Sequence, residues 1–166
     1  DVRHTFLMFT ADFVNQAYHG HPLYEEAVRR YAPFKGSTVI DVIRETKKVL
    51  EIVAIIGGQW PHSSYMVPGG IVSVPSTADL LQCRLILQQY RKWYEQRILG
   101  CSLERWSEVR SCSELERWLD ETTVHSESEL GFFIRFARSI GLDRIGRAHG
   151  SFVSFGSLDL PQGTSV

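Results

Sequence analysis

The sequence predicts a mainly α-helical protein. Two long segments with apolar residues at helical spacing flank a loop rich in glycine and proline, and shorter helical segments lie on either side of them. Residues 151–155, Ser-Phe-Val-Ser-Phe, alternate in the manner of a strand. We therefore expect a helical bundle with two long helices joined by a Gly/Pro-rich loop, and minor β structure near the C-terminus.

The boundaries of the expected helices follow from capping residues. Ser37 or Thr38 is expected to cap the first long helix with a side-chain oxygen, and Gly57-Gly58 ends it. Ser76-Thr77-Ala78-Asp79 starts the second long helix, and Ser126-Glu127-Ser128-Glu129 is expected to form a capping box for the last one. The expected helices are residues 3–16, 23–31, 38–57, 76–100 and 103–109, a helix opening at residue 113, and residues 126–141.

Length and composition indicate one domain, residues 1–166, or the central part of a larger one. Hydrophobic residues make up 43% of the chain and charged residues 22%, with a formal net charge of -1, so neither nucleic acid nor an acidic membrane is an expected partner. The longest apolar run, residues 52–56, is far too short to span a membrane, and no signal peptide is visible. The chain opens at Asp1 without methionine and stops in a loop, so we expect a soluble excerpt of a longer protein.

The cysteines and histidines do not have the spacing of a metal site. Cys83 falls on the apolar face of a helix and is expected to be a buried thiol, while Cys101 and Cys112 lie at helix ends. Free thiols in odd number suit a reducing compartment. The histidines lack a partner at ligand spacing, so this segment alone is expected to hold no metal. They are His4, His19, His21, His62, His125 and His149.

Known catalytic motifs are also absent from the sequence. There is no nucleophile elbow, phosphate loop or dinucleotide fingerprint, and the glycines of residues 141–146 follow no strand. The spacing of Trp93, Trp106 and Trp118 favours core packing over a stacking platform for bases. A self-sufficient catalytic site is therefore not expected.

The most informative segment is the loop of residues 57–70, Gly-Gly-Gln-Trp-Pro-His-Ser-Ser-Tyr-Met-Val-Pro-Gly-Gly. Two glycine pairs and two prolines shape its backbone, and it carries Trp60, His62 and Tyr65. A simple connection between helices needs only a few polar residues. Loops of this composition are where function tends to lie.

This loop resembles an internal motif of nickel–iron hydrogenase large subunits. In that family a helix ends in two glycines, followed by a basic or polar residue, any residue, Pro-His and a second glycine pair, as in residues 54–62 and 68–70 here. Residues 24–31, Tyr-Glu-Glu-Ala-Val-Arg-Arg-Tyr, are similar to the uptake and hydrogen-sensing branch. Pro61-His62-Ser63-Ser64 stands where many members have Pro-His-Pro-Gln, which also points to that branch.

The resemblance implies a cytoplasmic uptake hydrogenase, whose large subunit holds a nickel–iron centre and passes electrons to an iron–sulfur small subunit. The family binds its metals with two C-x-x-C pairs, and neither is present here, so this segment would be scaffold and partner surface, inactive alone. Two alternatives are a hydrogen-sensing regulatory subunit and a non-catalytic helical scaffold related to the large subunit of respiratory complex I.

One residue of the motif carries a role over from the family. His62 would be an outer-shell group near the small-subunit cluster, hydrogen-bonding across the interface. Alternatively, it only satisfies backbone groups of a tight loop. Trp60 and Tyr65 would be interface anchors or would pack against the neighbouring helices. No residue is expected to be catalytic or to ligate metal directly.

Overall fold

The protein is mainly α-helical, as the sequence predicts. The computed structural model describes residues 1–145. Its helices are α1 (Val2–Leu7), α2 (Tyr24–Tyr31), α3 (Ser37–Gly57), α4 (Thr77–Trp93), α5 (Leu103–Ser107), α6 (Cys112–Glu121), α7 (Thr123–Glu127) and α8 (Glu129–Ser139). Three 3₁₀ helices, η1 (Phe9–Val14), η2 (Gln16–Tyr18) and η4 (Leu142–Arg144), and a π-helix, η3 (Tyr94–Leu99), complete them.

The described β structure is a two-stranded antiparallel hairpin. Strand β1 (Met66–Val67) pairs with β2 (Gly70–Ile71), with Met66 opposite Ile71 and Val67 opposite Gly70. It therefore lies in the loop between α3 and α4. The strand expected at residues 151–155 lies outside the described residues.

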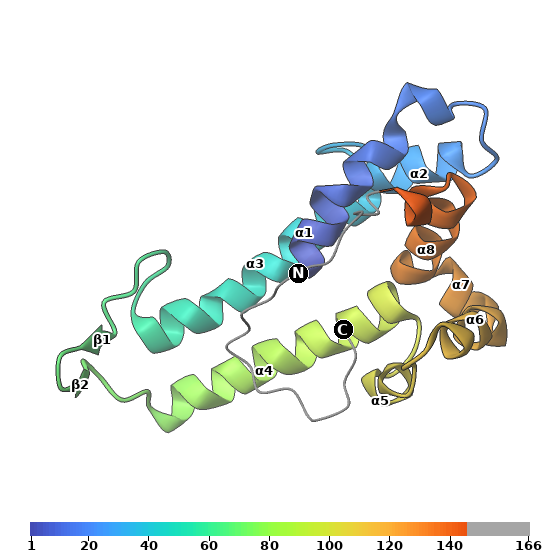
Figure 1. The fold of residues 1–166 in the computed structure, drawn as a ribbon. Helices are drawn as coiled ribbons and strands as arrows, with labels where there is room; N and C mark the ends of the chain where they lie inside the picture. The colour runs from blue at the N-terminus through green and yellow to red at the C-terminus, as the bar shows by residue number, and fades with distance from the viewer. Residues whose placement is uncertain (146–166) are drawn as a thin grey trace, which may run out of the picture.

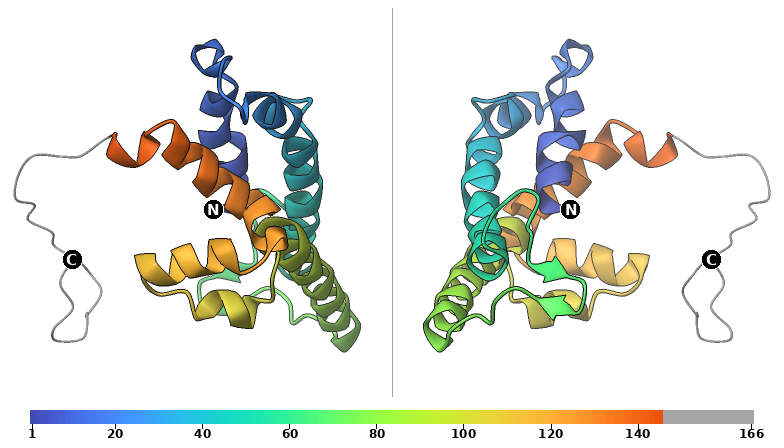
Figure 2. Two further views of the ribbon diagram at one scale, coloured as in Figure 1. Left: turned by 90° about the vertical axis from the view of Figure 1, so that its right-hand side faces the viewer. Right: turned by 90° about the vertical axis from the view of Figure 1, so that its left-hand side faces the viewer.

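The described chain forms two regions, which we call the head and the arm. The arm comprises residues 47–93: the second half of α3, the hairpin loop, and α4, which runs back alongside α3 (Figure 1). The head comprises the other described residues, in which α1 and α2 pack against α3, and α8 packs against η1 and η3. Seen from either side, α5 and α6 lie apart from α2 (Figure 2).

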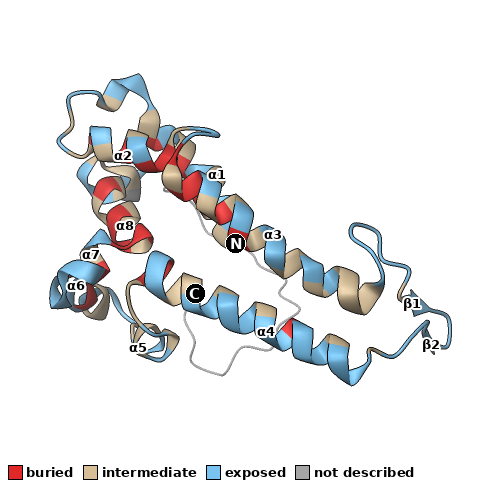
Figure 3. Cartoon of the chain, turned by 180° about the vertical axis from the view of Figure 1, so that it is seen from behind, coloured by how far each residue is buried: buried red, intermediate tan, exposed pale blue. Residues whose placement is uncertain are grey.

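The core lies in the head. Phe13 is buried against the rings of Tyr31, Phe133 and Phe136, at centroid distances of 5.8, 5.3 and 4.9 Å. Burial is concentrated around α2, α8 and the start of α3, while most of the arm is exposed (Figure 3). Aromatic pairs of this kind add to the free energy that burial of apolar area supplies. The head therefore holds most of the buried apolar side chains.

A buried ion network joins α2 to α8 inside the head. The Arg30 guanidinium lies 3.4 Å from the Glu129 carboxylate and stacks over the Phe132 ring at 4.4 Å. Glu129 also pairs with Arg97 at 3.1 Å and accepts a hydrogen bond from the Tyr31 hydroxyl at 3.3 Å. Because Arg30 and Glu129 are both buried, the pairing offsets the cost of removing their charges from water.

The prediction of one helix over residues 3–16 is wrong. α1 ends at Leu7, and η1 continues the chain as a 3₁₀ helix from Phe9. The Thr10 hydroxyl donates to the Phe6 carbonyl at 2.9 Å, so a side chain occupies the acceptor that the backbone of a regular helix would use.

Two predicted caps are also wrong. Gly36, in extended conformation, precedes α3, and within residues 1–145 the hydroxyls of Ser37 and Thr38 are buried without a partner. A Cβ at Gly36 would collide with the carbonyl of Arg30, so close packing of α2 on α3 sets this turn. At α8 the cap is Ser128, whose hydroxyl accepts the Gly131 N–H at 3.1 Å; residue 126 lies inside α7 instead.

The second long helix has a change of geometry that the sequence did not reveal. Its start is as predicted: Ser76 accepts the Asp79 N–H at 3.2 Å and donates its own N–H to the Asp79 carboxylate at 2.9 Å. After Trp93 the chain continues as the π-helix η3 to Gly100, which adopts a φ of 71°. Single π-helical turns are rare insertions in α-helices, and here the turn carries Ile98 and Leu99 into the core.

Candidate functional site

The Gly/Pro-rich loop lies at the far end of the arm, away from the head (Figure 1). α3 ends where Gly58 takes a φ of 80°, in the left-handed region that glycine permits. From Ile52 to Ala78 the sequence contains no Asp, Glu, Lys or Arg. Seven large apolar side chains of this uncharged segment are exposed: Val53, Trp60, Met66, Val67, Ile71, Val72 and Val74. Such an uncharged, apolar and exposed surface is typical of a contact with another molecule.

His62 is presented to solvent on this loop in an unusual backbone conformation. Its φ is 64°, a value that residues other than glycine rarely adopt. The peptide bond between Trp60 and Pro61 is cis. The Gln59 side-chain amide donates to the His62 carbonyl at 2.6 Å. Within residues 1–145 the imidazole itself makes no hydrogen bond. The sequence predicts that His62 lies near the iron–sulfur cluster of a partner subunit, and this stays a prediction.

Ser63 ties the end of α3 to the loop. Its hydroxyl donates to the Gly57 carbonyl at 2.7 Å and accepts the Tyr65 N–H at 3.2 Å. A Cβ at residue 57 would collide with the Ser63 hydroxyl in this position, so glycine leaves room for the hydrogen bond. The Val72 N–H then donates to the Tyr65 carbonyl at 2.9 Å and joins the two sides of the hairpin.

Trp60 and Tyr65 are placed differently. Trp60 is 56% exposed, so most of its ring is free to contact a partner. Tyr65 is half-buried beside Val72 and lines a pocket of about 260 Å³ with Gly58 and Gln59. Of the two aromatic residues, Trp60 therefore fits the description of an anchor better, and Tyr65 belongs to the packing of the loop.

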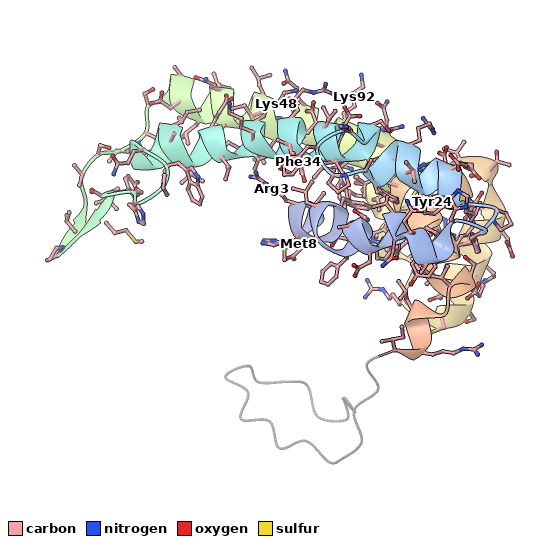
Figure 4. All side chains as sticks on the ribbon, turned by 90° about the horizontal axis from the view of Figure 1, so that it is seen from above. Arg3, Met8, Tyr24, Phe34, Lys48 and Lys92 are labelled. Carbon is pink, nitrogen blue, oxygen red and sulfur yellow. The ribbon has the colours of Figure 1, made fainter. Side chains whose placement is uncertain are left out.

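A larger groove lies where α1 meets the arm. It has a volume of about 770 Å³ and apolar walls from Val49, Leu50, Leu87, Tyr90 and Tyr94, and residues 1–4 and Arg91 also line it. Desolvation by burial raises the pKa of Tyr90 and of Tyr94, so both hydroxyls stay protonated at neutral pH. Lys48 and Lys92 project from the opposite side of the α3–α4 pair (Figure 4). The groove is thus mainly an apolar surface.

The three cysteines lie on separate elements. Cys83 is buried on α4, as predicted, and Cys112 is exposed at the first turn of α6. Cys101 accepts a hydrogen bond from the Trp118 indole at 3.3 Å, and burial raises the pKa of its thiol. Among residues 1–145 no three His, Cys, Asp or Glu side chains gather as a metal site would require. The thiols present do not form the donor set that a nickel–iron centre requires.

Trp106 and Trp118 pack in the head and Trp93 packs against the core from the end of α4, as predicted. Trp118 is buried, with Trp106 edge-on at 5.0 Å and the His125 ring stacked on it at 5.1 Å. His125 is buried in turn, with Nδ1 at 2.9 Å from the Trp118 carbonyl. This histidine therefore contributes to the core of the head.

Two residues of the loop were not singled out by sequence reasoning. Gln59 and Ser63 each bond a backbone carbonyl of the loop, at His62 and Gly57 respectively. In the sequence they are two polar residues, Gln59 two positions before Pro61 and Ser63 directly after His62. Nothing in the sequence distinguishes them from other polar residues of the loop.

In the part of the chain that the structure describes, none of the helices combines the length and apolar character that a membrane span requires.

No protein-family profile matches the sequence. The resemblance to hydrogenases, read from the motif around His62 and from residues 24–31, therefore stays a prediction from the sequence.

Proposed function

We propose that this chain is the central helical part of the large subunit of a cytoplasmic nickel–iron uptake hydrogenase, and that it serves as scaffold and partner surface. The parent enzyme would oxidise dihydrogen and pass electrons to an iron–sulfur small subunit. The observation that carries the proposal is the end of the arm, where the Gly-Gly…Pro-His…Gly-Gly motif presents His62 among exposed, uncharged apolar residues.

The division of the molecule supports a scaffold role. The head has its own core, whereas the arm projects from it with apolar residues on α4 that are about half exposed, such as Leu80 at 52% and Leu85 at 57%. A monomer rarely exposes so much apolar surface on one element without a contact for it. In the proposed complex the small subunit meets the end of the arm, with Trp60 as an anchor and His62 near the cluster.

The metal chemistry belongs to other parts of the proposed parent protein. Soft thiolates suit nickel and low-spin iron, and the three cysteines of this chain are separated on α4, before α5 and on α6. They do not fit the bimetallic group, so we derive no catalytic step from this chain. The isolated chain is expected to be inactive and to contain no stoichiometric nickel.

The first test is the coding sequence on both sides of this chain. The proposal expects one C-x-x-C pair before Asp1 and another after Val166. Absence of both would overturn the hydrogenase assignment and leave the helical scaffold related to complex I. Turnover of the complete heterodimer with dihydrogen and an acceptor dye separates the uptake enzyme from a hydrogen sensor, which would show little turnover.

The second test is His62→Ala in the complete heterodimer. We expect slower electron transfer to the dye or weaker subunit assembly, with nickel content unchanged, because His62 would act across the interface and not on the metal. His19→Ala, which removes an exposed histidine of the head, is the matched control. Loss of nickel from the His62 variant would contradict the proposed role.

A further inference from the structure

The backbone of His62 is held in a conformation that the residue does not favour. A φ of 64° lies in the left-handed region, where a side chain carrying Cβ is strained. An unrestrained exposed loop would relax to a negative φ at this residue. Something in the loop must therefore offset the strain, and the hydrogen bonds around His62 show what does so.

Gln59 restrains the carbonyl side of His62. Its amide nitrogen lies 2.6 Å from the His62 oxygen, although both residues are exposed and water could satisfy each of them. The bond spans three residues and closes a ring around Trp60 and Pro61. It orients the peptide that follows His62 and so restrains ψ at that residue.

Ser63 restrains the next residue from the opposite side. Its hydroxyl donates to the Gly57 carbonyl at 2.7 Å and accepts the Tyr65 N–H at 3.2 Å. The first bond fixes the loop to the last turn of α3, and the second fixes the turn that follows. Ser64, the adjacent serine, is exposed and makes no side-chain hydrogen bond among residues 1–145.

These bonds leave the imidazole free. Both side chains bind backbone atoms around His62, whereas its ring is exposed and has no hydrogen-bond partner among residues 1–145. The loop thus fixes the backbone from which the imidazole projects and leaves both ring nitrogens without a hydrogen bond to residues 1–145.

We propose that Gln59 and Ser63 are positioning residues that hold His62 in the left-handed conformation, so that its imidazole is directed at the partner surface before the partner binds. The inference deepens the proposed function and rests on it for the identity of the partner. Such preorganisation improves affinity because the loop does not have to be ordered on binding. It also predicts which chemistry each position requires: an N–H donor at residue 59 and a hydroxyl at residue 63.

The first measurement is made on the 166-residue chain alone, by NMR. The three-bond coupling between the amide and α protons of His62, with its carbon shifts, reports φ. We expect a left-handed value in the unmodified chain and in Ser64→Ala, the matched control. Gln59→Leu and Ser63→Ala should move the average toward negative φ, while Gln59→Arg and Ser63→Thr, which keep the donor or the hydroxyl, should restore it.

The second measurement is the affinity of the complete large subunit for the iron–sulfur small subunit. Gln59→Leu and His62→Ala should each weaken binding about tenfold, and the double variant should be no weaker than His62→Ala, because both changes remove the same interaction. Additive losses in the double variant would overturn the positioning role.

The two ideas fail in different ways. If Gln59→Leu and Ser63→Ala leave the coupling of His62 unchanged, the positioning inference is wrong, whatever the affinities are. If the coupling changes as expected but His62→Ala binds the small subunit normally, the positioning holds and the proposed function of His62 is wrong.

Discussion

The head and the arm are both built from helices, but they treat apolar side chains in opposite ways. Of the fourteen buried hydrophobic residues in the described chain, only Cys83 lies in the arm, whereas eleven of the seventeen exposed large hydrophobics do. The head can therefore be stabilised by its own core. The arm lacks the second layer that a pair of amphipathic helices needs, so its apolar residues are available for contacts outside the described chain.

The head and the arm also differ in their charged residues. The head encloses ion pairs such as Arg30–Glu129, and the end of the arm has no charged residue between Glu51 and Asp79. Exposed surfaces normally carry charges for solubility. The absence of charge at the end of the arm indicates that this surface is kept apolar for a reason other than folding.

The largest expected effect is the removal of a core ring from the head. Phe136 is fully buried, and its ring lies 4.9 Å from that of Phe13 and 6.0 Å from that of Phe132. Phe136→Ala should lower the free energy of unfolding by about 3–5 kcal/mol, because it removes apolar contacts and leaves a cavity. Urea denaturation followed by circular dichroism measures this loss.

The matched change in the arm is Leu85→Ala. Leu85 is 57% exposed, so truncation should cost about 1 kcal/mol or less. Equal losses for the two variants would contradict the division into a self-supporting head and an uncovered arm.

The sequence predicts where most helices begin and end better than it predicts the contacts between them. Gly58 and Gly100 end helical segments, and Ser76 with Asp79 starts one, because these signals act through bonds within a few residues. The choice between Ser126 and Ser128 could not be predicted this way. A Cβ at Gly131 would collide with the carbonyl of His125, so the start of α8 packs closely against α7, an arrangement that depends on the sharp turn between these two helices at Ser128.

The exposure of the arm was beyond sequence reasoning for a similar reason. Leu80 and Leu87 lie seven residues apart on one face of α4, and the periodicity predicts an apolar face but not what covers it. At the loop, glycine and proline predict a shaped turn around His62. The roles of Gln59 and Ser63 depend on which backbone carbonyls the finished turn brings to them, so they required the structure.

A smaller effect tests the charges of the head. Hydrogen bonds from the Arg29 and Arg30 guanidiniums, with their charges, lower the pKa of Glu26 to about 2 from 4.5. Since the folded pKa is depressed, the carboxylate stabilises the fold above pH 4.5, and this contribution is lost as the pH falls toward 2. With a side chain 30% exposed, the contribution is roughly 1–2 kcal/mol after solvent screening.

Glu26→Gln should therefore flatten the decline in unfolding free energy between pH 5 and pH 2, measured by urea denaturation at each pH. Glu25→Gln is the control, because Glu25 is exposed and forms no ion pair within residues 1–145. A parallel decline in the Glu26 variant and the unmodified chain would show that the guanidiniums do not stabilise the carboxylate.

The last expected effect is local and lies in the arm, at the start of α4. Ser76→Ala removes the side chain that accepts the Asp79 N–H at 3.2 Å and should cost about 1 kcal/mol locally. Because few tertiary contacts hold this end of the arm, the loss should appear as faster hydrogen exchange in the first turn of α4, with the unfolding of the head unchanged. Ser73→Ala, at an exposed serine without a side-chain hydrogen bond among residues 1–145, is the control. If Ser76→Ala instead lowers the stability of the whole chain, the arm and the head unfold as one unit, and the exposed face of the arm is stabilised by more than its own helices.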